Sequence, residues 1–129
     1  MDHNPLPFAP TEETRMLQDL VARFVDKELI PLEPAILKRE AEGKGFKLSE
    51  EEETRLLARC KELGLWGLDV PEEFGGANLS LSALAAAEEE LGRACVPFVI
   101  PPDSPNLHMM LSVANSMQRE RYLAPYAEG

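Results

Sequence analysis

The stretch GLWGLDVPEEFGGANLS, from Gly64 to Ser80, decides the fold of this chain. It holds four of the eight glycines, one proline and the only tryptophan, Trp66. Glycine and proline mark turns and loops, but apolar residues stand between them here, so a solvated linker is not expected. We predict a loop of fixed shape that joins two helices and packs on one side. Trp66 is predicted to be a core anchor, with stacking on a ligand as the alternative.

A helix is predicted immediately before this loop, from Ser49 to Leu63. Ser49 and Glu52 have the spacing of a capping box, in which each side chain accepts a hydrogen bond from the other residue's backbone amide. Gly64 is placed to end the helix, because glycine readily adopts the left-handed conformation of a helix stop. The inward stripe is predicted to be Leu56, Leu57, Cys60 and Leu63.

Another helix is predicted after the loop, capped by Ser80 or Ser82 and ended by Gly92. Its run of alanines predicts close packing against a neighbour. The acidic run Glu88–Glu90 is interpreted as a solvated face, with paired carboxylates for acid–base chemistry as the alternative. The inward stripe is predicted to be Leu84, Ala85, Glu88 and Leu91.

The N-terminal part carries one longer helical pattern. Residues 1–10 are proline-rich and predicted to be extended. Thr11 is a fair helix cap, and the apolar residues that follow recur at helical spacing. This helix is expected to end near Pro31, because proline cannot continue the hydrogen-bond ladder. Residues 31–45 are expected to be mostly exposed, with a short helical piece around 35–41.

A second unusual connection, CVPFVIPPDSPN, runs from Cys95 to Asn106 and holds four prolines. Ser104 before Pro105 fits a helix cap followed by proline at the first helical position. The helix that follows is predicted to turn Leu107 and Leu111 inward. A last helix is predicted to be capped by Ser116, with Met117, Tyr122 and Leu123 on its buried side.

Composition narrows the class of protein. The 129 residues suffice for one domain, and their net charge of −10 argues against electrostatic binding to nucleic acid or to an anionic membrane. No apolar run of about 18 residues predicts a membrane span, and no targeting segment is recognisable, so a cytoplasmic protein with two reduced thiols is expected. We predict no metal site. The fold class is predicted to be all-α, an orthogonal or antiparallel bundle of about five or six helices.

Four motifs in order resemble the N-terminal helical domain of the acyl-CoA dehydrogenase family. KELGLWGLDVPEEFGGANLS is similar to the family's Gly-Gly motif, ALAAAEEELGRA to its acidic helix, and QRERYLAP to its Gln-Lys-x-x-Tyr-Leu segment. Pro31 at the end of the first helical pattern fits the family's opening. The resemblance extends from about Phe8 to Gly129, and we expect residues 11–129 to form this domain.

The resemblance implies a subunit of three parts, of which a middle β-domain and a C-terminal helical bundle are absent from these 129 residues. The catalytic base belongs to the absent bundle, so no catalytic residue is expected here. The parent is expected to use FAD and an acyl-CoA substrate, to pass electrons to electron-transfer flavoprotein or another acceptor, and to be a homo-oligomer. The chain is expected to be a domain fragment or a truncated product, inactive alone and without tightly bound FAD.

The resemblance also assigns roles to the two unusual loops. The Gly-Gly loop is implied to be mainly architectural, and the Cys95–Asn106 loop to help line the acyl pocket, with helix packing as the alternative for its residues. The PPDSPN stretch is similar to a subgroup with an APDxxN-like loop, while Ala114 replaces a glycine common in relatives. The structural-motif residues are Trp66, Pro71, Phe74, Gly75 and Gly76, and the pocket candidates are Phe98, Val99, Pro101, Asp103, Ser104 and Asn106.

Two other readings stay open from the sequence. One is a standalone helical module that binds a partner protein. The other is a flavoprotein of the same superfamily with different chemistry, such as an acyl-CoA oxidase or a flavin monooxygenase.

Overall fold

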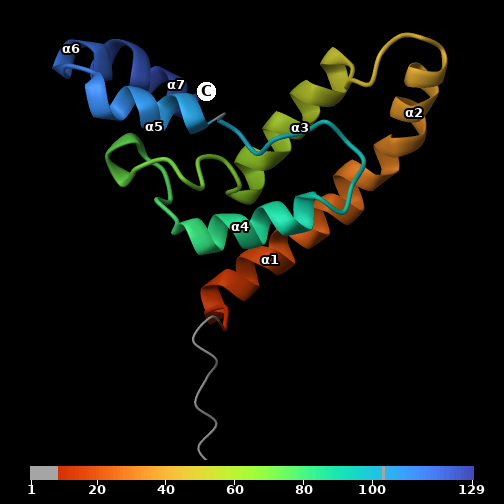
Figure 1. Cartoon of the computed structure of the whole chain (residues 1–129), viewed down its shortest axis with the longest axis horizontal. Coiled ribbons are helices and arrows are strands. Elements are labelled where there is room, and N and C mark those ends of the chain that lie inside the picture. Colours follow the sequence, from red (N-terminus) through yellow and green to blue (C-terminus); the bar gives the residue numbers. More distant parts are fainter. Residues whose placement is uncertain (1–8, 103) are drawn as a thin grey trace, which may run out of the picture.

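The computed structural model describes residues 9–102 and 104–129. Across these ranges the chain forms helices and loops and no β-strand, which confirms the predicted all-α class (Figure 1). The prediction for residues 1–8 and the candidate Asp103 lie outside the described residues. The main helices are α1 (Glu12–Phe24), α2 (Glu33–Ala41), α3 (Glu50–Leu63), α4 (Leu81–Leu91) and α5 (Ser104–Val113), followed by the short helices α6 (Ser116–Gln118) and α7 (Ala124–Glu128).

The first helix ends near Pro31, as predicted, but the chain keeps a helical path beyond it. After α1, a π-helical turn η1 (Val25–Leu29) and a 3₁₀ turn η2 (Ile30–Leu32) lead directly into α2. Pro31 and Pro34 each lie in the first turn of their segments, where a missing amide donor leaves no hydrogen bond unmade. The prediction of a short helical piece near residues 35–41 is correct, and its one fully buried side chain is Ile36.

The ends of α3 and the start of α4 are formed by the capping residues that the sequence predicted. Ser49 and Glu52 form the predicted capping box, and Gly64 ends α3 with a φ of 72°. Ser80, not Ser82, caps α4 by accepting a hydrogen bond from the amide of Ala83.

The buried face of α4 differs from the predicted stripe. Ala83, Ala87 and Leu91 are buried, whereas Leu84 is only half-buried. Because α4 packs along α1, small alanine side chains occupy the close contact, and the face is rotated by about one residue from the prediction. The predicted stripe members Ala85 and Glu88 are both exposed.

The larger core lies where α1, α3 and α4 meet. In Figure 1, α3 runs back beside α1, and the segment after α4 passes over the bundle. Phe24 and Leu56 are almost completely buried in this core. We call it the first cluster, and its buried members are Val21, Phe24, Val25, Leu29, Leu56, Cys60, Leu65, Leu68, Ala87, Leu91 and Ile100.

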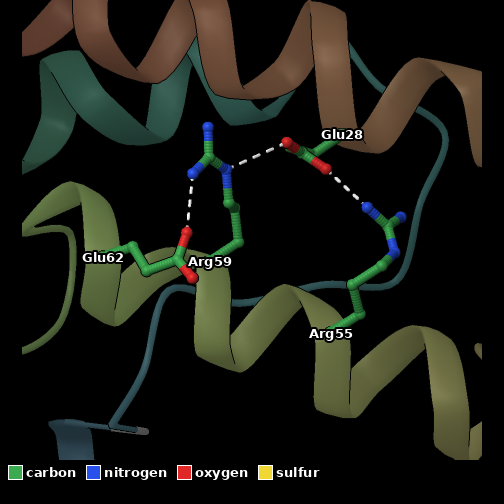
Figure 2. Close-up of polar contacts among 4 residues, drawn as sticks. All are labelled: Glu28, Arg55, Arg59 and Glu62. Atoms are coloured by element: carbon green, nitrogen blue, oxygen red, sulfur yellow. Dashed lines mark hydrogen bonds and ion pairs between the residues drawn. The ribbon is translucent and has the colours of Figure 1, made fainter.

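An ion-pair network holds η1 to α3 at the edge of this cluster (Figure 2). The carboxylate of Glu28 accepts hydrogen bonds from Arg55 at 2.5 Å and from Arg59 at 3.2 Å. Arg59 also pairs with Glu62 at 2.6 Å. Burial, and to a lesser degree the charge of Glu28, raises the pKa of the Cys60 thiol to about 12, so this cysteine stays protonated and unreactive.

A second cluster lies between the Gly64–Ser80 loop and the helices that follow residue 103. Its buried members are Val70, Leu107, Leu123 and Ala127. Asn115, rather than Ser116, caps α6 through a capping box with Gln118, because the asparagine side chain accepts from the Gln118 amide at 3.0 Å.

The predicted burial of the last helix is wrong for two of three residues. Met117 and Tyr122 are 57% and 55% exposed, and only Leu123 is buried. Between α6 and α7 the chain forms a π-helical turn η4 (Arg119–Leu123). A π turn holds an additional residue compared with an α turn, so the inward face shifts away from Tyr122.

Candidate functional site

The Gly-Gly loop is closed on itself by backbone hydrogen bonds. The amides of Ala77, Asn78 and Leu79 donate to carbonyls of the first half of the loop, from residues 67–70, at 2.8 to 2.9 Å. Gly76 lies against Val70, and a Cβ added at Gly76 would stand 2.0 Å from the Val70 carbonyl oxygen. Only glycine fits at that position.

The centre of the loop is a 3₁₀ turn, η3 (Glu72–Phe74), that follows Pro71. The Pro71 carbonyl accepts from the amides of Phe74 and Gly76 at 3.0 and 3.2 Å. Gly75 ends the turn with a φ of 80°, and Phe74 packs against the second cluster. These contacts give the loop the fixed shape that its composition predicts.

Trp66 connects the loop to the end of the described chain. Its indole Nε1 donates to the Ala127 carbonyl at 2.7 Å. The ammonium of Lys61 lies 4.3 Å from the centre of the indole ring and donates to the Gly129 carbonyl at 3.3 Å. The half-buried indole therefore anchors α7 to the end of α3.

The second loop is joined to the first by its backbone. The Pro101 carbonyl accepts from the Gly67 amide at 2.9 Å, and Pro101 is buried. The Phe98 ring lies 5.8 Å from the Phe24 ring and packs against the first cluster. Of the pocket candidates, these two therefore face inward.

The other candidates lie differently. Val99 is 65% exposed, and Asn106 is exposed in the first half of α5. Ser104 begins α5, but its side chain, like all of Asp103, lies outside the described part of the chain. The four candidates whose side chains the structure describes do not form one cluster, because they divide into a packed pair and an exposed pair.

The outer face of α5 carries an apolar stripe that the sequence analysis missed. Met109 and Val113 are 61% and 74% exposed. Together with Asn106 they have the spacing i, i+3 and i+7, which places them on one side of a helix. This spacing is the feature of the sequence from which the stripe could have been predicted. The inner face is held by the fully buried Leu107.

Two hollows lie on the part of the chain that the structure describes. A groove of about 940 Å³ lies between the start of α1 and α4, with Glu13 and Glu89 among its lining residues and no basic side chain. A second hollow of about 570 Å³ lies beside Trp66 and has Lys61 as its one basic side chain. A cation beside its pyrophosphate favours the binding of a dinucleotide such as FAD; the lining of the groove includes none, and that of the second hollow includes one. Within the described ranges no group of three His, Cys, Asp or Glu residues could hold a metal ion.

The fold and the two joined loops define the class of protein, and comparison with known proteins agrees. Residues 11–129 match the family model described as "Acyl-CoA dehydrogenase, N-terminal domain". The chain therefore belongs to the acyl-CoA dehydrogenase family and corresponds to its N-terminal domain.

Individual relatives support the same assignment. The chain is 33% identical to (R)-benzylsuccinyl-CoA dehydrogenase of Thauera aromatica over 96% of its own length and 32% of that protein. It is 31% identical to the mitochondrial short-chain specific acyl-CoA dehydrogenase of Rattus norvegicus, over 92% of this chain and 27% of the relative. The chain thus spans between a quarter and a third of the length of these curated relatives.

Solved structures share the fold. A putative acyl-CoA dehydrogenase from Mycobacterium abscessus superposes with a TM-score of 0.75 at 30% identity, over 93% of this chain and 32% of that chain. A chain from the structure of the electron transferring flavoprotein of Acidaminococcus fermentans gives a TM-score of 0.63 at 26% identity, over 96% of this chain and 31% of that one. Among the described residues, no helix is both long and apolar enough to cross a membrane.

Proposed function

We propose that this chain serves as the N-terminal domain of an FAD-dependent acyl-CoA dehydrogenase and forms one wall of its acyl-CoA pocket. The observation that carries the proposal is the exposed apolar stripe of α5, Met109 and Val113, on a helix whose inner face is fixed against the Gly-Gly loop. Val99, in the segment that leads into α5, adds a further exposed apolar side chain.

The physical role of such a wall is to bury the acyl group. Each CH₂ group removed from water contributes roughly 0.8 kcal/mol to binding. A wall that is already ordered before the substrate arrives loses little entropy on binding. The parts of the parent protein beyond this domain are expected to supply the base that removes the α-proton and to hold the FAD, which would provide the hydride acceptor when bound. The 129 residues alone are therefore expected to be inactive.

The parent is proposed to act on acyl-CoA thioesters and to pass electrons to electron-transfer flavoprotein or another acceptor. We further propose a homo-oligomeric cytoplasmic protein. The names of the relatives include both a benzylsuccinyl-CoA and a short-chain acyl-CoA dehydrogenase, so the substrates to try first are one aromatic and one short straight-chain acyl-CoA.

The test uses the complete translated protein that carries this domain, with a dye as electron acceptor. Met109→Asp puts a charge on the proposed wall and is expected to raise the KM for acyl-CoA by roughly tenfold or more, because burying an unpaired carboxylate costs several kcal/mol. Met16→Asp is the matched control, because Met16 is 66% exposed on α1, away from α5. Equal KM values for the two variants would reject the proposal that α5 forms a wall of the acyl-CoA pocket.

The same assay separates the other readings. A protein that reduces oxygen with each substrate turnover is an oxidase, and one that inserts oxygen into its substrate is a monooxygenase. A protein without turnover of any acyl-CoA would instead support a standalone binding module.

A further inference from the structure

Arg119 joins the end of α5 to turn η3 of the Gly-Gly loop. Its Nη2 donates to the Leu111 carbonyl at 2.7 Å, and its Nε donates to the Ala114 carbonyl at 3.4 Å. Its Nη1 pairs with the Glu73 carboxylate of turn η3 at 3.3 Å. The guanidinium is planar and rigid, with its donors in fixed directions. Three acceptors on one guanidinium therefore fix both the position and the rotation of the end of α5.

The end of α5 needs such a partner. The last carbonyls of a helix receive no hydrogen bond from an amide of the same helix. Leu111 and Ala114 lie at this end of α5. Leu107, in the first half of α5, is almost completely buried, whereas Met110 and Leu111 in the second half are half-buried. Apolar packing thus holds the first half of the helix more firmly than the second.

The first half has a polar contact of its own to the same loop. The His108 ring nitrogen Nε2 lies 3.2 Å from the Asp69 carboxylate. Asp69 and Glu73 both belong to the Gly64–Ser80 loop, so polar contacts attach α5 to this loop near the middle of the helix, through His108, and at its C-terminal end, through Arg119. The loop shape, which requires glycine at Gly76, is thereby transmitted to the outer stripe of α5.

We propose that Arg119 is a positioning residue of the acyl pocket. It does not touch the substrate. It sets how far Val113 and Met109 project toward the acyl group by fixing the end of α5 to turn η3. This inference rests on the proposed role of α5 as a pocket wall, and it adds the residue on which the geometry of that wall depends.

The experiment compares Arg119→Met, Arg119→Lys and Arg121→Met in the complete translated protein. Arg121 is the control, since it is exposed on the same turn and its guanidinium lies 5.6 Å from the Tyr122 ring. KM and kcat are measured for a short, a long and an aromatic acyl-CoA. Small misplacements of a binding surface change rates and affinities strongly. Arg119→Met is therefore expected to raise KM for the long and aromatic substrates about tenfold relative to the short one.

Arg119→Lys should give an intermediate shift, because the lysine retains the charge near the helix carbonyls but cannot contact three acceptors in one plane. Arg121→Met should leave the KM ratios unchanged. A purely structural role would reduce the fraction of folded enzyme, which lowers the maximal rate for all substrates equally and leaves every KM as it was. Unchanged KM ratios in Arg119→Met would therefore overturn the proposal, even if the protein melts at a lower temperature.

A second measurement addresses the attachment itself. Amide hydrogen exchange in the 129-residue chain should be faster at the end of α5 in Arg119→Met than in Arg121→Met, and equal rates would overturn the proposal. The proposed function fails in a different way: the wild-type protein then turns over no acyl-CoA, and the positioning role falls with it. If the wild-type protein is active and Arg119→Met leaves the KM ratios unchanged, only the positioning role of Arg119 is rejected, and the proposed function stands.

Discussion

Replacing Gly76 with alanine tests the claim that the shape of the Gly64–Ser80 loop depends on close backbone contact. Gly76 is not among the glycines with positive φ, so its backbone conformation suits alanine. The cost is steric: the new Cβ would lie 2.0 Å from the Val70 carbonyl oxygen and 2.4 Å from the carbonyl carbon. These are backbone atoms, which cannot rotate away as a side chain can.

The magnitude follows from that geometry. Overpacking in a rigid site costs about 1–3 kcal/mol, and a clash with backbone belongs at the upper end, so we expect a loss of about 3 kcal/mol in the free energy of unfolding. For a chain of this size that lowers Tm by roughly 12 °C. Urea unfolding followed by circular dichroism measures the free energy.

Two other glycines are matched controls. Gly43 and Gly75 have φ values of +72° and +80°, and a Cβ at either would meet no atom within 4 Å. Alanine at either position should cost only the strain of a left-handed residue, about 1–2 kcal/mol. The reasoning is refuted if Gly76→Ala is no more destabilising than Gly43→Ala.

Two further predictions concern charged groups. Glu28→Gln is expected to lower the free energy of unfolding by about 1 kcal/mol, because the hydrogen bonds to the two arginines weaken but both arginines remain partly solvated. Glu62→Gln is its control, since Glu62 is 63% exposed, and an equal loss in the two variants would contradict the prediction. The hydrogen bond from Arg39 holds the pKa of Glu52 below its ordinary value of 4.5. Because the pKa is lower in the folded state, this stabilisation is complete above about pH 4.5 and is lost as the pH falls through the folded value. Urea unfolding at several pH values should therefore show that the stability difference between wild type and Glu52→Gln shrinks in acid, and a constant difference would exclude the linkage.

The helix boundaries that the sequence predicted correctly are those with local chemical causes. The capping box at Ser49, the cap at Thr11 and the left-handed stop at Gly64 each depend on residues within one helical turn. Such rules need no knowledge of the tertiary structure. The all-α class followed from the same local patterns.

The errors arise where the helical period changes or where two elements meet. The π turns at Val25–Leu29 and Arg119–Leu123 shift the buried face, and no local signal in the sequence marked them. Pro31 correctly predicted the end of the first helix, but not that a new helical segment begins there at once, since proline is compatible with a first helical turn. The rotated face of α4 is set by its contact with α1, which the sequence of α4 does not contain.

The candidate site was predicted only in part, because the positions of its side chains depend on contacts between elements that are distant in sequence. The Cys95–Asn106 loop was singled out by its prolines, but its lack of periodicity gave no information about which side chains face the core. The Phe24 ring packs with Phe98, and the Gly67 amide binds the carbonyl of Pro101, so both inward positions depend on partners far away in sequence. Met109 and Val113 have a helical spacing, but the sequence alone does not show that this face of α5 is exposed. Arg119 contacts backbone carbonyls, and no sequence motif reveals such contacts.

The concentration of glycine, proline and tryptophan in one connection has a structural cause. Leu65 and Leu68 belong to the first cluster, whereas Val70 belongs to the second. The chain must therefore pass from one core to the other within a few residues and then return, with residues 77–79 hydrogen-bonded to residues 67–70. A reversal that tight brings backbone against backbone at Gly76, where any side chain would force the two halves apart. Because α5 is attached to this same loop near its middle and at its C-terminal end, separating the halves would move α5 relative to the first cluster. The stability of the loop and the geometry of the proposed pocket wall are thus consequences of one close contact.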